Sequence, residues 1–319
     1  MSHRMSAPSR YIVVGGAGFV GRAVLERWPL AERNSVAVLL RHAAPDWLRA
    51  LGFATAEGGI DALAARPDLI GPDSAIINLA RPEGDGGFVA LTRRLIDVAA
   101  ARNCRRYLHV SSIDVYGNCR ETRIDARTVP VPATPYQREH LHAETVALNG
   151  LGAGQGVVLR LGAVFGAGGT NARVFTVEAM KATYCRLMLR RVLNGHRRMY
   201  LVPVETAADA VRFLAGPDTK PPASHLLLAE DHLPENNFAA VQATLMAVFG
   251  RASVDGLPAL PPWALRQALR LRRRWSADPM RRFDDQELDR MGFRRHVDFR
   301  ERLQAYAISL QAERHGAGE

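Results

Sequence analysis

The sequence predicts an α/β protein built on a doubly wound parallel sheet, and three observations lead to this prediction. The chain has 319 residues, which suits one large domain or a large domain with an appendage. Its 47% hydrophobic and 23% charged residues are ordinary globular composition and exclude a disordered or low-complexity chain. In the first half, short apolar runs alternate with stretches of helical periodicity, which is typical of right-handed crossovers in a parallel sheet.

The expected elements follow one another along the first half of the chain. The predicted strands are 10–14, 35–40, 75–79, 106–110 and 156–159, and the predicted helices are 18–27, 46–51, 87–102 and 134–148. The second half is less regular, with proline-rich breaks at 216–222 and 256–262. We therefore expect a main domain at residues 10–165 and a smaller C-terminal lobe at 166–319 that returns some segments to the main sheet.

Cysteine content and charge narrow the class of protein. Three scattered cysteines without a C-x-x-C pair favour a reducing compartment, and no apolar stretch approaches the roughly 18 residues of a membrane span. We therefore expect a cytoplasmic protein without a transmembrane segment or a metal site. The balance of 42 Lys and Arg against 32 Asp and Glu gives a net charge of +10, which favours anionic partners without choosing among them.

The first predicted strand leads into a glycine-rich loop of a kind that binds phosphate groups. Gly15, Gly18 and Gly21 lie directly after this strand and at the start of the first predicted helix. Gly15 allows a tight turn, Gly18 allows backbone N–H groups to approach a pyrophosphate, and Gly21 allows close packing of helix on sheet. The helix N-terminus at Phe19 and Val20 adds partial positive charge. This combination predicts a dinucleotide-binding domain of the Rossmann type.

The end of the second predicted strand bears on the choice of dinucleotide. A carboxylate that binds the ribose hydroxyls is usual at this point, but here the strand ends in Arg41. A guanidinium fits a 2′-phosphate, which indicates NAD(P) with a slight preference for NADP. An exposed Arg41 without a cofactor role is the alternative.

Hydroxyl and acidic side chains follow the fourth predicted strand. Ser112 and Asp114 lie at its carboxyl end, where open α/β sheets bind their ligands. Twenty-four residues after Ser112, Tyr136 opens a predicted helix, and His140 follows four residues later on the same helical face.

Together these motifs resemble the extended short-chain dehydrogenase/reductase family, the nucleotide-sugar epimerases, dehydratases and 4-ketoreductases. The shared features are the glycine loop, Asn78 and Ala80 at the end of a strand, the Ser-Ser-x-x-Val-Tyr-Gly segment at 111–117, the Pro-Tyr helix start at 135–136, the segments 159–166 and 201–210, and the Met-Gly-Phe triplet at 291–293. The resemblance implies a nucleotide-linked sugar as substrate, Asn78 and Ala80 near the cofactor, and a homodimer.

The resemblance also implies roles for the catalytic side chains. Tyr136, as phenolate, would take the proton of the sugar hydroxyl, and Ser112 would hold the developing carbonyl oxygen. A free tyrosine with a pKa of about 10 is only about 1% ionised at pH 8, and the family lowers this pKa with a lysine four residues further on. This chain has His140 there, and a neutral histidine offers a hydrogen bond but little Coulombic help.

The substrate end of the site is less defined by sequence. The dehydratase branch of the family carries a paired Asp-Glu after its catalytic hydroxyl, whereas this chain has the single carboxylate of Asp114. Ketone reduction or epimerisation is therefore favoured over dehydration. By rough alignment, Arg198 and Arg281 are expected to bind the substrate diphosphate.

Two other functions stay open at this point. Loss of the lysine is compatible with a dinucleotide-binding sensor or scaffold that has weak or no turnover. The amphipathic stretch 263–275, with Leu265 and Leu269 on one stripe and four arginines on another, is compatible with a peripheral membrane or nucleic-acid binder. We regard an ordinary solvated helix face as the commoner outcome and expect no nucleic-acid partner.

Overall fold

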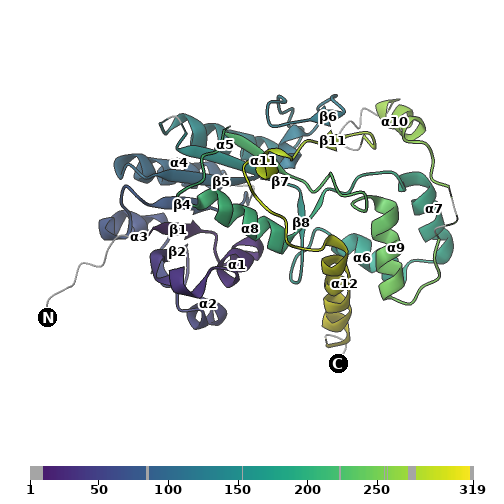
Figure 1. The fold of residues 1–319 in the computed structure, drawn as a ribbon, viewed down its shortest axis with the longest axis horizontal. Helices are drawn as coiled ribbons and strands as arrows, with labels where there is room; N and C mark the ends of the chain where they lie inside the picture. The colour runs from purple at the N-terminus through teal and green to yellow at the C-terminus, as the bar shows by residue number, and fades with distance from the viewer. Residues whose placement is uncertain are drawn as a thin grey trace.

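The computed structural model describes residues 10–83, 86–152, 154–222, 224–254, 256, 258–271 and 278–316. Within these residues, seven strands form one sheet in the order β10-β7-β5-β4-β1-β2-β3, and all its neighbours pair in parallel (Figure 1). The strands are β1 (Tyr11–Val14), β2 (Val36–Leu40), β3 (Ala54–Glu57), β4 (Ala75–Asn78), β5 (Arg106–Ser112), β7 (Gly156–Leu161) and β10 (His225–Leu228). The predicted doubly wound parallel sheet is confirmed.

Several elements of the first half were not predicted, among them one strand of the main sheet. Strand β3 and the helix α3 (Ile60–Ala65) follow the second strand, where the sequence shows no continuous apolar run. Strand β3 lies at the edge of the sheet and buries only Ala56, so its residues need little hydrophobicity. The five predicted strands differ from the observed ones by at most two residues at either end.

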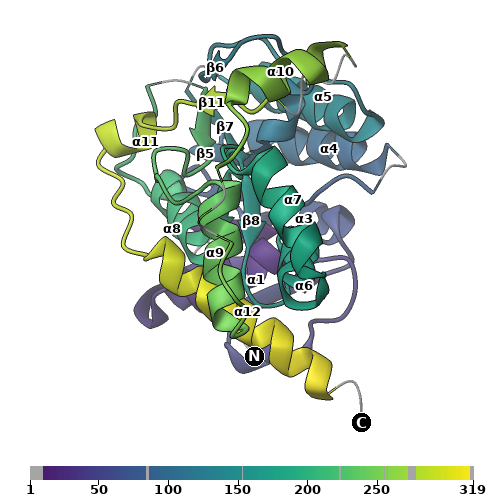
Figure 2. The same ribbon diagram turned by 90° about the vertical axis from the view of Figure 1, so that its right-hand side faces the viewer.

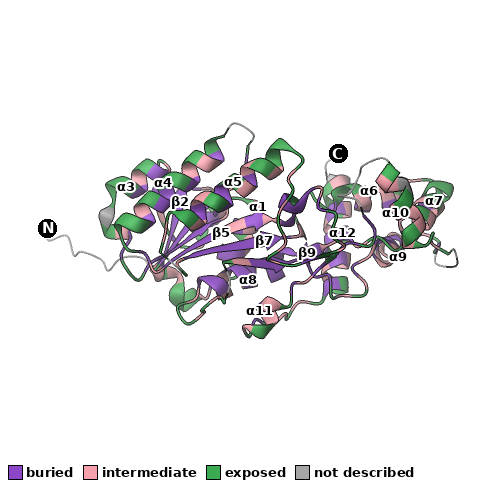
Figure 3. Cartoon of the chain, turned by 90° about the horizontal axis from the view of Figure 1, so that it is seen from above, coloured by how far each residue is buried: buried purple, intermediate pink, exposed green. Residues whose placement is uncertain are grey.

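Helices cover both faces of the sheet. One face packs against α1 (Phe19–Glu26), α2 (Asp46–Ala50), α8 (Val204–Ala215) and α11 (Glu287–Arg290), and the other against α3, α4 (Gly87–Ala101) and α5 (Pro135–Asn149). Figure 3 shows α3, α4 and α5 on one side of the sheet and α8 and α11 on the other. Since α8 and β10 come from the second half of the chain, that half contributes a helix and an edge strand to the main sheet.

The rest of the second half has a hydrophobic core of its own. It contains α6 (Arg173–Lys181), α7 (Tyr184–Asn194), α9 (Phe238–Val248), α10 (Pro262–Leu271) and α12 (Phe299–Gly316), with the parallel pair β8 (Ala163–Phe165) and β9 (Leu201–Pro203). Phe165, Leu187, Phe238 and Leu245 lie in this core. A second parallel pair, β6 (Arg123–Ile124) with β11 (Arg282–Phe283), packs near the carboxyl end of β10, and short 3-10 turns are η1 (Leu30–Ser35), η2 (Pro67–Leu69) and η3 (Ile113–Tyr116). In the described part of the chain, no helix is both long enough and apolar enough to cross a membrane.

Candidate active site

The glycine loop has the geometry that a dinucleotide requires. Gly15 has φ +77°, and a Cβ there would lie 2.7 Å from the backbone nitrogen of Ala80. A Cβ on Gly21 would lie 2.3 Å from the carbonyl oxygen of Gly15, so only glycine allows α1 to pack this close to the loop. Gly18 is the N-cap residue and has no side chain to cover the first N–H groups of the helix, at Phe19 and Val20, and no acidic residue lies in the first turn. The residues present therefore fit a pyrophosphate at this helix end.

Asn78 fixes the chain beside this loop. Its side chain is fully buried; Oδ1 accepts a hydrogen bond from the backbone N–H of Ala80 at 3.1 Å, and Nδ2 donates to the hydroxyl of Tyr107 at 2.9 Å. The backbone of the β4–α4 loop is thus held against Gly15. Asn78 acts on the site through the loop that it positions.

Arg41 lies at the end of β2 and forms an ion pair across the site. Its Nη2 lies 2.7 Å from Oε1 of Glu83 on the β4–α4 loop, and both side chains are exposed. Glu83 was not identified from sequence because it is 42 residues away along the chain. This end of the site therefore offers a cation for a 2′-phosphate and a carboxylate for ribose hydroxyls.

Two capping motifs position Ser112 and Tyr136. Ser112 Oγ accepts a hydrogen bond from the backbone N–H of Asp114 at 3.1 Å, which leaves its O–H free to donate to another oxygen. Thr134 caps α5: its side chain accepts from the N–H of Gln137, and the Gln137 side chain accepts from the N–H of Thr134. Pro135 occupies the first turn, where a missing N–H costs nothing. Tyr136 is 41% exposed at this helix start.

His140 is buried between Tyr136 and the sheet. It is 3% exposed, and its ring centroid lies 4.6 Å from that of Tyr136 in an edge-to-face contact. Burial lowers the pKa of His140 to about 4, so the ring is neutral at neutral pH. The imidazole therefore places no positive charge beside Tyr136.

The neighbours of His140 decide which of its nitrogens carries the proton. Ser111 Oγ donates to Oε1 of Glu144 at 2.5 Å and lies 3.4 Å from Nδ1 of His140. Because the Ser111 proton is already given to Glu144, Ser111 can only accept from His140, which places the imidazole proton on Nδ1. Nε2 of His140 is then a bare acceptor, and it has no hydrogen-bond partner in the described structure.

A buried ion pair joins Glu144 to Arg160. Arg160 Nη2 lies 2.6 Å from Glu144 Oε2, and Arg160 Nη1 donates to the hydroxyl of Tyr116 at 2.7 Å. Arg160 and Glu144 are almost completely inaccessible to solvent. Sequence reasoning missed this pair, although Glu144 lies four residues after His140 on the same helical face. Its effect is to hold Ser111, and through Ser111 the ring of His140, in one orientation.

The environment of the Tyr136 phenol disfavours its ionisation. Partial burial raises the pKa of Tyr136, and the carboxylate of Asp114 raises it further. Within the described residues, the opposing cation is Arg81, which lowers this pKa without reversing the shift. Arg81 follows Ala80 on the β4–α4 loop and was not singled out from sequence.

Arg198 and Arg281 both bind groups of the protein itself. Arg198 Nε lies 2.5 Å from Oδ1 of Asp231, and its Nη2 donates to the carbonyl oxygen of Leu233 at 2.7 Å. Arg281 is buried and donates to the carbonyl oxygens of Gly117 and Cys119 at 3.2 and 2.7 Å. Arg198 thus holds the chain after β10, and Arg281 ties the segment before β11 to the chain after η3. The role of either guanidinium toward a diphosphate stays a prediction.

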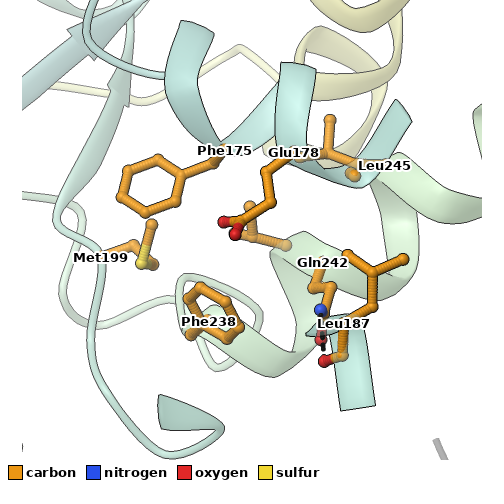
Figure 4. A pocket seen from close by; sticks show the side chains of 9 residues that line it. Phe175, Glu178, Leu187, Met199, Phe238, Gln242 and Leu245 are labelled. Atoms are coloured by element: carbon orange, nitrogen blue, oxygen red, sulfur yellow. Dashed lines mark hydrogen bonds between the residues drawn. The ribbon is translucent and has the colours of Figure 1, made fainter. Parts of the chain in front are cut away.

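Two hollows have linings that do not include Tyr136, and the first lies within the C-terminal half. The first, between α6, α7 and α9, has a volume of ≈ 10 Å³, room for about one water molecule (Figure 4). Glu178 and Gln242 are the polar side chains that point into it, and Oε1 of Gln242 has no partner there. The second, of ≈ 330 Å³, lies beside β11 and includes His232 and Asp285. The first is too small for a metabolite.

Comparison with known proteins identifies related sequences and folds. The profile of the NAD dependent epimerase/dehydratase family matches residues 11–226. The dTDP-6-deoxy-L-talose 4-dehydrogenase (NAD(P)(+)) of Kitasatospora kifunensis is 32% identical over 199 residues, which are 57% of this chain and 60% of that protein. The chain therefore matches less than two thirds of the length of this relative.

Solved structures show the same fold at low identity. A crystal structure of a putative epimerase from Burkholderia cenocepacia J2315 matches with a TM-score of 0.70 and 20% identity, covering 96% of this chain and 100% of that one. The Bordetella bronchiseptica enzyme WbmG, in complex with NAD and UDP, matches with a TM-score of 0.68 and 15% identity over 98% and 96%. UDP-N-acetylglucosamine 4-epimerase from Bacillus cereus matches with a TM-score of 0.62 and 15% identity over 95% and 100%.

Proposed function

Since the chain belongs to the NAD-dependent epimerase/dehydratase family, we propose that it is an NAD(P)-dependent oxidoreductase or epimerase that acts on a nucleotide-linked sugar. The observation that carries this proposal is that Ser112 ends strand β5 of the sheet that holds the glycine loop, and that Tyr136, at the start of α5, lies close enough to Asp114 to feel its charge. The name of the Kitasatospora relative suggests dTDP-linked 6-deoxyhexoses as the first substrates to try.

The bound nicotinamide supplies the hydride acceptor or donor, and the side chains handle the proton. Tyr136, as phenolate, takes the proton of the sugar hydroxyl as the carbonyl forms, or returns it in the reverse direction. Ser112, held by the N–H of Asp114, donates its free O–H to the sugar oxygen and stabilises the charge that develops there. Asp114, next to Ser112, is proposed as a further substrate contact.

His140 replaces the family lysine in position but not in charge. With its proton on Nδ1, its Nε2 can only accept a hydrogen bond, whereas a lysine would donate one, and this nitrogen is buried without a partner among the described residues. The phenol of Tyr136 therefore ionises without a neighbouring ammonium, and we expect slow turnover that rises with pH. A dinucleotide-binding protein with almost no turnover is the second candidate, and the neutral, buried imidazole favours it.

Three finer points belong to the same proposal. We propose a slight preference for NADP, in which Arg41 binds the 2′-phosphate and exchanges its contact with Glu83 for this anion. We also propose a homodimer and a cytoplasmic location. Light scattering of the purified protein tests the first of these two, and fluorescence microscopy of the tagged chain tests the second.

The main test combines cofactor binding with turnover. The purified protein is titrated with NAD and NADP by calorimetry, then assayed with dTDP- and UDP-sugars from pH 7 to 10, beside Tyr136→Phe. We expect both proteins to bind cofactor with similar affinity, and the variant to lose at least 100-fold in turnover. Fast turnover that is indifferent to Tyr136→Phe would refute the mechanism, and absence of heat with either dinucleotide would refute the proposal as a whole.

A further inference from the structure

Positive charge is concentrated in two segments of the C-terminal half. Residues 173–198 and 251–282 together contain 15 Lys and Arg but only 3 Asp and Glu, a net charge of +12. The remainder of the chain contains 27 Lys and Arg and 29 Asp and Glu, a net charge of −2. The basic character of this protein is therefore local, and it does not reflect a general excess of arginine.

The fold brings these two segments together. The hydroxyl of Tyr184, at the start of α7, donates to the carbonyl oxygen of Ser253, and the N–H of Leu260 donates to the carbonyl oxygen of Val192 near its end. The second segment thus follows the length of α7 before α10 begins at Pro262. Both helices lie at the end of the molecule that is on the right in Figure 1 and faces the viewer in Figure 2.

Large apolar side chains point outward from the same two helices. On α7, Leu189 and Leu193 are exposed one turn apart, and Leu189 is 58% exposed. On α10, Trp263 and Leu271 lie eight residues apart on one stripe, with exposures of 65% and 87%. Leu260, between the helices, is also exposed. We call α7, residues 258–260 and α10 the α7–α10 surface.

Charge and shape together select one kind of partner for this surface. A nucleotide-sugar diphosphate carries about two negative charges and accounts neither for the arginines of α7 and α10 nor for the outward leucines. A second copy of the chain would bring the same positive charge and be repelled. The phosphates of a nucleic acid can pair with the arginines, but its backbone offers no apolar environment that would bury Leu189 and Leu271. An anionic bilayer interacts with both kinds of side chain, because its phosphates pair with the arginines and its interfacial region buries the Leu and Trp side chains.

We propose that the α7–α10 surface binds the surface of an anionic phospholipid bilayer. Arg186, 65% exposed as a side chain and paired with Glu178 at 2.9 Å, is one of the arginines that exchange their contacts for lipid phosphates. The sequence continues after α10 with Arg272, Arg273 and Arg274, which lie outside the described residues. Association at this surface leaves the glycine loop and Tyr136, which belong to other elements, free for their ligands.

The test measures binding of the full chain to vesicles by flotation. Vesicles of phosphatidylcholine alone are compared with vesicles containing 30 mol% phosphatidylglycerol, at 50 and 500 mM NaCl. We expect at least tenfold stronger binding to the anionic vesicles at low salt, and at least a tenfold loss at high salt, because the Debye length falls well below 10 Å. Equal binding to both lipids, or none to the anionic vesicles at low salt, overturns the proposal.

Matched variants locate the contact. Trp263→Ser with Leu271→Ser is expected to weaken binding at least tenfold, whereas Leu30→Ser with Ile308→Ser, which remove similarly exposed apolar side chains elsewhere, change it less than twofold. Circular dichroism confirms that both double variants are folded. Unchanged vesicle binding by the first double variant overturns the proposal. So does a duplex oligonucleotide that binds more tightly than the vesicles, or a loss of self-association without a loss of vesicle binding.

Discussion

The glycine loop and the first turns of α5 differ in how well they suit a dinucleotide enzyme. The loop has the backbone geometry for cofactor binding, whereas α5 lacks a positive charge beside Tyr136. In the loop, Gly15 and Gly21 occupy positions where a Cβ would overlap backbone atoms, and Asn78 holds the adjacent chain in place. On α5, Tyr136 keeps its capped helix start, but His140 is neutral and buried.

The difference separates binding from turnover. Cofactor binding depends on backbone geometry, which the sequence around Gly15 preserves in full. In the proposed mechanism, proton transfer depends on the ionisation of the Tyr136 phenol, whose pKa is raised by burial and by Asp114 and lowered by Arg81 among the described cations. Affinity for the dinucleotide and rate of turnover are therefore expected to respond to different substitutions.

The largest expected effect is on binding, at Gly21. Gly21→Ala puts a methyl group 2.3 Å from the carbonyl oxygen of Gly15 and 2.6 Å from the Cα of Gly16, so the loop must move. We expect the affinity for NAD or NADP to fall at least 50-fold in calorimetry, with a stability loss of about 2 kcal/mol. Gly256→Ala is the control, because its Cβ meets nothing within 4 Å. Equal affinity of both variants would contradict the role given to the loop.

The second prediction concerns His140 and pH. Burial lowers the pKa of His140 to about 4, whereas an unfolded histidine titrates near 6.5. The unfolded chain therefore takes up a proton between pH 6.5 and 4 that the folded chain does not, so the free energy of unfolding falls as the pH falls through this window. His140 accounts for about 2 kcal/mol of this loss between pH 7 and 4.5.

Urea unfolding at both pH values measures this loss. His140→Gln is expected to remove about 2 kcal/mol of the pH dependence, and His42→Gln, which replaces an exposed histidine, is the matched control. The fully buried His109, with a pKa lowered to about 3 by burial and by His140, keeps part of the dependence in the His140 variant. A pH dependence that is the same in all three proteins would show that His140 is accessible to protons in the folded state.

The contrast between loop and helix also explains which features could be predicted from sequence. Strands β1, β2, β4, β5 and β7 lie inside the sheet and are buried over most of their length, so each has an apolar stretch that is visible without a structure. The glycine spacing of the loop is likewise local in sequence. Strand β3 is half exposed at the sheet edge and carries no such signal.

Contacts between distant segments could not be predicted in this way. The Arg41–Glu83 pair depends on how the β4–α4 loop crosses the end of β2, and the Glu144–Arg160 pair depends on the packing of α5 against β7. The spacing of Tyr136 and His140 predicted a shared helical face, and their rings do touch. The burial that makes His140 neutral comes from α4, whose Phe88 ring lies 5.4 Å away, and could not be inferred from α5 alone.

The third prediction restores the missing charge. His140→Lys puts an ammonium near Tyr136, which should lower the pKa of the phenol by about one unit and raise turnover at pH 7.5 about tenfold. The pH profile of kcat should shift to lower pH by the same amount. Arg81→Gln should shift it in the opposite direction by a smaller amount, because Arg81 is exposed to solvent.

His140→Met is the control for these rate measurements, since it keeps the volume and adds no charge. Cofactor affinity is measured in parallel, to separate changes in the phenol from changes in binding. A rate for His140→Lys no higher than that of His140→Met would show that phenol ionisation does not limit turnover.

The smallest expected effect concerns the choice of dinucleotide at Arg41 and Glu83. The two side chains are exposed, so their interaction is worth at most about 1 kcal/mol, which corresponds to about fivefold in affinity. Arg41→Gln should weaken NADP by about this factor and leave NAD nearly unchanged, because only NADP carries the 2′-phosphate. Glu83→Gln should strengthen NADP, because it frees the guanidinium and removes a carboxylate that repels the phosphate. Calorimetric titration of both variants with both dinucleotides gives the affinity of each variant relative to the unchanged protein. Equal weakening of NAD and NADP binding by Arg41→Gln would show that Arg41 supports the loop and does not bind the 2′-phosphate.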